Sequence, residues 1–225
     1  MAALTWDTIG ERFYETGVDH AVLYPANKNG TYPTGVAWNG ITSINQAPSG
    51  ADSNPQYADN IKYIDLTSAE EFGGTIEALT YPEEFGECDG SAIAKPGIIL
   101  GQQERKMFGL SYRTKIGNDT EGQDHAYKLH LIYGAKVSPT DKSYNTVNDS
   151  PEAINFSWEF NTTPVPVNAT DAGGKKYRPV SHIEIDSRTA DPTKLRALEN
   201  KLYGGEEGEA SLPLPDEVIS MFNEV

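Results

Sequence analysis

The sequence predicts a mainly β protein with one or two flanking helices, and three observations support this fold class. Apolar and polar residues alternate with a period of two through the middle of the chain, as they do in half-buried strands. Helix signals are few, and the strongest lies near the C-terminal end. The chain of 225 residues includes 12 Tyr and 3 Trp, which favours a packed fold over a disordered one. We expect a single domain over residues 1–225.

The first third of the chain predicts short strands separated by turns. The candidate strands are residues 20–24, 35–39, 60–66 and 74–81. Residues 40–57 contain Pro48-Ser49-Gly50 and Asn54-Pro55, so we expect an extended loop there. A loop of this length usually has a function or is disordered. A short helix is expected over residues 81–85, because acidic residues favour a first turn.

The middle of the chain predicts a long β-hairpin. Phe108, Leu110 and Tyr112 alternate with polar or small residues in the first strand, and Leu129 and Leu131 do so in the second. Residues 117–124 between these strands are rich in turn-forming residues. The same alternation predicts strands over residues 154–161 and 182–186. Trp38 and Trp158 fall in predicted strands and are expected in the core.

The C-terminal third contains the clearest helix signal. Asp191-Pro192 is an N-cap followed by proline at the first helical position, and Gly204-Gly205 ends the run. Leu195, Leu198 and Leu202 have helical spacing, which predicts a helix that packs its leucines on a sheet. A second helix is expected over residues 215–222. We describe residues 204–225 as a C-terminal arm.

Composition limits the compartment and the partners. Cys88 is the single cysteine, so no internal disulfide exists, and its acidic neighbours Glu87 and Asp89 disfavour a reactive thiolate. The first residues lack the basic and apolar regions of a secretory signal, and no apolar run is long enough to span a bilayer. We therefore expect folding in a cytoplasm, with no membrane partner. A net charge of −15 predicts repulsion of nucleic acid.

The charge is unevenly distributed along the chain. Residues 65–89 contain eight acidic and no basic residues, and residues 204–225 contain six acidic and no basic residues. Residues 95–142 reverse the balance, with eight basic and five acidic residues. One interpretation is an ordinary solvated surface. The other is a pair of opposed patches that meet between identical subunits, where charge complementarity would set their register.

No motif for catalysis or cofactor binding is present in the sequence. It lacks a Gly-x-Ser-x-Gly elbow, a Walker loop and a Gly-x-Gly-x-x-Gly turn, so we expect no catalytic residue, no cofactor and no enzyme activity. His125 and His130 are expected on opposite faces of one strand, so we expect no metal site. Asp119, Glu121 and Asp124 leave a calcium ion as an open alternative in the predicted turn, although their spacing departs from an EF-hand.

Several segments resemble the major tail (tail tube) proteins of phages and prophages of Gram-positive bacteria. The most specific are PQYADNIKY (residues 55–63) and EEFGGTIEALTYPEEF (residues 70–85). Further similarity covers residues 11–25, 35–88, 101–119, 127–164 and 212–222, which is most of the chain.

The resemblance implies a fold and a function. Such proteins are β-sandwiches with a flanking helix, and six copies form a ring whose inner sheets close into one barrel around a lumen. Rings stack into the tail tube of the virion along the tape measure protein, between the distal tail or baseplate proteins and the tail terminator. DNA later passes through the lumen without specific binding. The tube is assembled in the cytoplasm of the bacterial host. We further predict that part of the acidic surplus faces this lumen.

Subunit contacts are predicted in the loop, the hairpin turn and the C-terminal arm. The residues expected to make them are Pro48, Asn54, Pro55, Tyr57, Asp119, Glu121, Asp216 and Phe222. The alternative function is a secreted or virion-borne β-sandwich module that binds glycan through surface aromatic residues. A β-rich hydrolase is a third alternative, but no nucleophile or metal constellation supports it.

Overall fold

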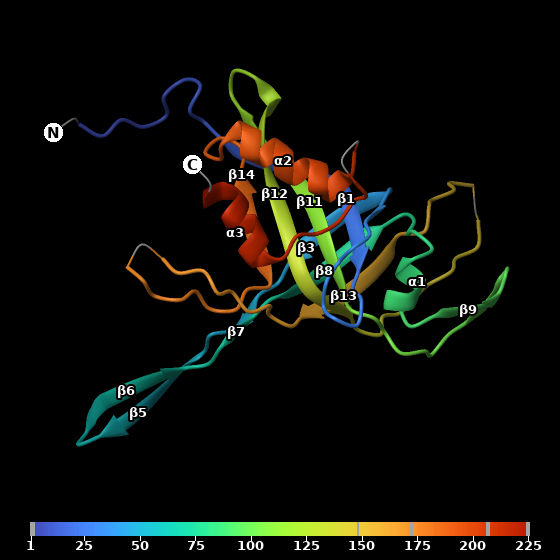
Figure 1. The fold of residues 1–225 in the computed structure, drawn as a ribbon, viewed down its shortest axis with the longest axis horizontal. Coiled ribbons are helices and arrows are strands. Elements are labelled where there is room, and N and C mark those ends of the chain that lie inside the picture. The colour runs from blue at the N-terminus through green and yellow to red at the C-terminus, as the bar shows by residue number, and fades with distance from the viewer. Residues whose placement is uncertain (1–2, 148, 172, 206–207, 224–225) are drawn as a thin grey trace.

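The computed structural model describes residues 3–147, 149–171, 173–205 and 208–223, and it is mainly β (Figure 1). Its main element is an eight-stranded antiparallel sheet with the order β2-β1-β11-β12-β13-β8-β3, in which β14 also pairs with β12. The strands of this sheet are β1 (Tyr14–Pro25), β2 (Val36–Ala37), β3 (Ile41–Gln46), β8 (Gly73–Ala78), β11 (Phe108–Asn118), β12 (Gly122–Val137), β13 (Phe156–Thr162) and β14 (His182–Asp186).

The remaining strands form short two-stranded ribbons outside this sheet. They are β4 (Ser49–Gly50), β5 (Ser53–Ala58), β6 (Ile61–Thr67), β7 (Glu70–Glu71), β9 (Ala92–Lys95) and β10 (Ile98–Leu100). β4 pairs with β7, β5 with β6, and β9 with β10. The helices are α1 (Phe85–Cys88), α2 (Pro192–Tyr203) and α3 (Pro215–Asn223). No helix among the described residues is long and apolar enough to cross a membrane.

The predicted long hairpin is confirmed as β11 and β12, the centre of the sheet. Its turn is shorter than predicted, because Asn118 already pairs with Gly122. The Asn118 side chain accepts hydrogen bonds from the backbone N–H groups of Thr120 and Glu121 and closes the turn locally. β12 then runs on to Val137, beyond the predicted end of the hairpin.

β12 changes partners along its length. Its residues Lys128–Ile132 pair with β14, and Ala135–Val137 pair with β13. Gly134 lies between these two stretches with a φ of 62°, and a Cβ there would lie 2.2 Å from the carbonyl oxygen of Thr163. A glycine is therefore required where the strand passes from one partner to the other.

One core lies between the two halves of the sheet. Side chains of β1, β11 and β12 meet those of β8 and β13 in a single buried cluster, which α1 closes at one end. Trp38 and Trp158 are both buried there, as predicted, with ring centroids 5.7 Å apart. Cys88 is also buried in this cluster, and burial raises the pKa of its thiol to about 12, with Glu87 adding to the effect. The cysteine is therefore a protonated core residue.

A second core lies under the helices on the other face of β12. Asp191 caps α2 by accepting hydrogen bonds from the N–H groups of Thr193 and Lys194, as the sequence predicts. Leu195, Leu198 and Leu202 are buried against residues of β1 and β12. Burying each leucine contributes about 1.5–3 kcal/mol. Figure 1 shows α2 and α3, in orange and red, lying together across this face.

The segment 40–57, expected as an extended loop, instead contains β3, β4 and β5. Residues 61–78 supply the pairing partners, and nothing in the local sequence of 40–57 reveals them. Its turn-forming residues fit a β-ribbon because Pro48 lies between strands and Pro55 lies in a ribbon with no further neighbour.

Other boundaries differ in smaller ways. The helix expected over residues 81–85 begins only at Phe85, because Pro82 and the residues after it form a turn in which Phe85 N–H bonds the Pro82 carbonyl. The strand expected over 154–161 begins at Phe156, and the one expected over 20–24 is the C-terminal half of β1. β9 and β10 were not predicted.

Candidate functional site

The most distinctive surface feature is a β-ribbon that projects from the sheet, which we call the arm (residues 47–72). Its root is the pair β3 and β8, and the Ala47 N–H donates a hydrogen bond to the Gly73 carbonyl where the chain leaves the sheet. β4 and β7 continue the ribbon, and β5 and β6 form its outer end. Figure 1 shows the arm extending away from the rest of the molecule.

The tip of the arm is a two-residue turn. Asp59 and Asn60 have φ values of 51° and 65°, so both central residues occupy the left-handed region, as in a type I′ turn. Such a turn matches the twist of a two-stranded ribbon, and Asp and Asn tolerate this conformation better than other non-glycine residues. This dipeptide, next to the predicted strand over residues 60–66, is the local signal that could have revealed the hairpin.

The outer part of the arm exposes large apolar side chains. Tyr57 and Tyr63 are each 71% exposed. Ile61, Ile64 and Leu66 are also exposed, and every residue of β6 belongs to the exposed class. An isolated two-stranded hairpin is marginally stable in water, and clustered exposed apolar residues mark interaction surfaces. The arm therefore has the composition of a contact element.

The arm is also strongly acidic. Residues 47–72 contain five acidic residues and one basic residue, a net charge of −4. The basic residue, Lys62, pairs with Asp65 at 2.5 Å, and Ser53 also donates a hydrogen bond to that carboxylate. These two hydrogen bonds lower the pKa of Asp65, so it is ionised at neutral pH.

A second exposed apolar ribbon consists of β9 and β10. Ile93 and Ile99 pair across it, and Ile98 pairs with Lys95. Each of these isoleucines is exposed, with Ile99 at 67%. A wide cleft of about 1430 Å³ separates the ribbon from α1 and from the segment around Pro139. The ribbon therefore has neither face covered by the rest of the chain.

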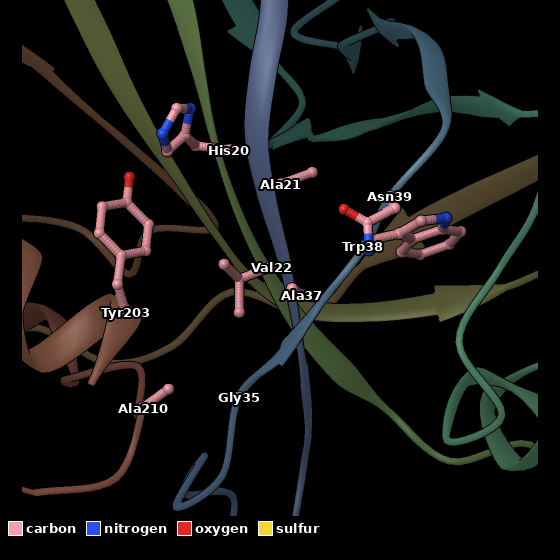
Figure 2. A pocket seen from close by; sticks show the side chains of 9 residues that line it. All are labelled: His20, Ala21, Val22, Gly35, Ala37, Trp38, Asn39, Tyr203 and Ala210. Carbon is pink, nitrogen blue, oxygen red and sulfur yellow. The ribbon is translucent and has the colours of Figure 1, made fainter. Parts of the chain in front are cut away.

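A smaller cavity of about 440 Å³ lies between β1, β2 and the end of α2 (Figure 2). Small residues form much of its wall, including Ala21, Gly35 and Ala210. Its polar side chains include those of Asn39, His20 and Tyr203, and the rings of the last two have centroids 5.9 Å apart.

Neither His20 nor Tyr203 is arranged as a catalytic group. His20 lies 2.9 Å from the carboxylate of Asp19 and 2.7 Å from the guanidinium of Arg113. Burial raises the pKa of Tyr203, so its hydroxyl stays protonated. The cavity thus lacks a nucleophile paired with a general base, the arrangement that nucleophilic catalysis requires.

The histidines form no metal site within the described residues. No group of three His, Cys, Asp or Glu side chains converges there on a common point. His130 and His182 do meet, with Nδ1 and Nε2 3.1 Å apart. Sequence reasoning missed this pair, because the pairing of β14 with β12 joins residues 52 positions apart.

The acidic residues of the predicted turn do not converge on a calcium position. Asp119 accepts a hydrogen bond from the Gly10 N–H and lies 3.8 Å from Arg12. Glu121 lies 2.8 Å from the His125 ring. Asp124 lies 3.6 Å from Lys115. Each carboxylate thus faces its own partner.

The predicted contact residues separate into three places. Pro48, Asn54, Pro55 and Tyr57 all lie on the arm, and each except the half-buried Pro55 is exposed. Asp119 and Glu121 lie at the exposed end of the β11–β12 hairpin. Asp216 accepts hydrogen bonds from the backbone of Asn168 and Ala169, and Phe222 packs against the second core. The last two side chains therefore already have partners within the chain.

Comparisons with known proteins do not identify the chain. No protein-family model and no curated protein sequence matches it.

Proposed function

We propose that this protein is a self-assembling structural subunit, the tail tube protein of a phage, which polymerises as stacked hexameric rings. The observation that carries the proposal is the arm, an ordered ribbon with exposed apolar side chains outside the core. A lone globular subunit gains nothing from such an element, whereas a polymer buries it against the next copy.

The sheet offers a physical basis for ring formation. Its path ends at β2 on one side and β3 on the other, and an unpaired strand edge is a template for pairing with another chain. In a closed ring, each copy's edge pairs with its neighbour's and the combined sheets form a barrel. The arm, which continues directly from β3, would then extend out of the ring plane toward an adjacent ring.

The charge of the molecule fits a conduit for DNA. A net charge of −15 opposes binding of phosphate groups, so a lumen lined with part of this charge lets DNA slide without sticking. The partners that follow from this role are other copies of the chain, the tape measure protein, the tail terminator and the distal tail or baseplate proteins.

Removing the outer arm tests the proposal. The variant replaces residues 52–68 with Asn-Gly, so that Ala51 and Ala69, whose backbones bond each other, still flank a hairpin turn. Negative-stain electron microscopy and size-exclusion chromatography at high concentration should show hollow tubes or six-fold rings for the parent protein. The variant should keep the circular dichroism spectrum of a folded β protein but form no tubes.

Other outcomes favour other functions. A parent protein that stays monomeric under these conditions contradicts the proposal, and binding in a glycan screen would then support the alternative of a glycan-binding module. Tubes formed by the truncated variant would show that the arm is not the stacking element. Tyr177→Ser, at a tyrosine 49% exposed elsewhere on the surface, is the matched control and should assemble normally.

A further inference from the structure

We infer that the β9–β10 ribbon is the surface of a neighbouring copy that receives the arm. This inference rests on the proposed function and adds to it the identity of the receiving surface. Both ribbons expose large apolar residues, and apolar surface of this kind is stabilised when it is buried in a contact.

The arm and the β9–β10 ribbon of one molecule cannot contact each other. Figure 1, in which the longest axis is horizontal, shows β5 and β6 at the left end of the molecule and β9 at the right end. A contact between them must therefore join two copies, and it uses different surfaces of each copy. Such a heterologous contact repeats from copy to copy and builds a polymer.

Charge complementarity indicates that the partner bound by the β9–β10 ribbon is the arm of a second copy. The arm has a net charge of −4, whereas residues 92–107 contain three basic residues and one acidic residue. Lys106 of this segment pairs with Glu87, but Lys95 is exposed beside Ile98 and makes no ion pair within the part of the chain that the structure describes. Lys95 is the one charged residue of the β9–β10 ribbon, so an acidic arm fits this ribbon better than it fits a second acidic arm.

The two faces of the β9–β10 ribbon differ in their surroundings. Ile93 and Ile99 line the cleft, whose wall also carries Glu83 and Glu84. Ile98 and Lys95 pair with each other, and side chains alternate along a strand, so they lie on the other face together with Leu100. Glu83 and Glu84 repel an acidic arm from the cleft, so the contact is expected on the face that carries Ile98, Leu100 and Lys95.

Site-specific cross-linking tests the inference directly. The photoreactive amino acid p-benzoyl-phenylalanine is placed at position 63, and the protein is mixed with an isotope-labelled parent chain before irradiation. Mass spectrometry should find cross-links between position 63 of one copy and residues 92–107 of another. The same probe at position 177, which does not line the cleft beside the ribbon, should give no cross-link to these residues.

Substitutions in the ribbon give an independent measurement. The double variant Ile98→Ser/Leu100→Ser should raise the protein concentration needed for assembly about tenfold or more, because buried apolar area is lost. Lys95→Glu should raise it several-fold, whereas Lys28→Glu, at another exposed lysine, should leave it unchanged. Circular dichroism should show that each variant remains folded.

The outcomes separate this inference from the proposed function. Tubes that form with cross-links from position 63 to a different surface overturn the inference and leave the proposed function standing. Cross-links from position 63 to residues 92–107 of the same chain also overturn it. A parent protein that does not associate contradicts both.

Discussion

At the scale of single residues, the most unusual arrangement is a column of four stacked rings. Tyr112 stacks on His130 at 4.7 Å, His130 on His182 at 5.4 Å, and His182 on Phe72 at 4.9 Å. Burial lowers the pKa of both histidines, that of His130 to about 4, and the neighbouring His182 lowers the pKa of His130 further. Glu184, 3.9 Å from His130, opposes this effect only in part.

The lowered pKa predicts that the folded protein loses stability in mild acid. An unfolded histidine binds a proton below about 6.5, whereas folded His130 does so only near 4, so the unfolded state binds more protons between these values. The free energy of unfolding should fall by roughly 3 kcal/mol from His130 as the pH drops from 6.5 to 4. Urea titrations at several pH values check this.

A variant separates His130 from the other groups that titrate in acid. His130→Gln keeps a polar side chain but has no proton to bind, so its stability should depend less steeply on pH between 6.5 and 4 than that of the parent protein. An unchanged slope would mean that the histidine pair does not titrate as its burial indicates. His125→Gln, at a more exposed histidine, is the control.

At the scale of elements, local sequence signals and long-range pairing contribute differently. The helix α2 was predicted because its cap, its proline and its leucines all lie within the helix or beside it. The β11–β12 hairpin was predicted because its strands are adjacent in the sequence. The sequence predicts the strand over residues 60–66, which is β6 of the arm, but it indicates a loop where β4 and β5 lie and no strand at β9 or β10. These short, exposed strands have no alternation of buried and exposed residues that would reveal them.

In the candidate site, too, local signals were visible in the sequence and long-range contacts were not. The sequence placed Tyr57 and its neighbours in a contact segment, and the structure places them on the projecting arm, but their contacts remain a prediction. It gave no indication that Asp216 and Phe222 are held within the chain. Asp216 bonds Asn168, and Phe222 packs against the second core, whose residues come from Val22 to Val218, so no local sequence pattern reveals either contact.

The buried leucines of α2 should supply most of the free energy that holds this helix on the sheet. Leu198→Ala removes a fully buried side chain, so the free energy of unfolding should fall by about 2–5 kcal/mol. Chemical denaturation measures this change. Leu4→Ala, at a leucine 79% exposed, should change stability little, and an equal effect at both positions would argue against the packing of α2 described here.

At the scale of the whole molecule, the dominant property is its negative charge. A net charge of −15 predicts that the protein does not retain DNA, because binding needs clustered Lys and Arg to displace counterions. In an electrophoretic mobility assay, duplex DNA should migrate unchanged in the presence of assembled protein at physiological salt. Retarded DNA would contradict the expectation of an acidic lumen and would require a search for a basic surface.

The partner change of β12 has a consequence for the rate at which the chain folds. This one strand bonds β11, β13 and β14, so its completion waits for segments that extend to Asp186. Contacts between residues far apart in sequence slow folding, typically to milliseconds or seconds. During synthesis the arm and the first strands emerge before β14 exists to cover β12. A newly made chain therefore exposes the apolar residues of the arm before its own sheet is complete, and aggregation competes with folding at that stage.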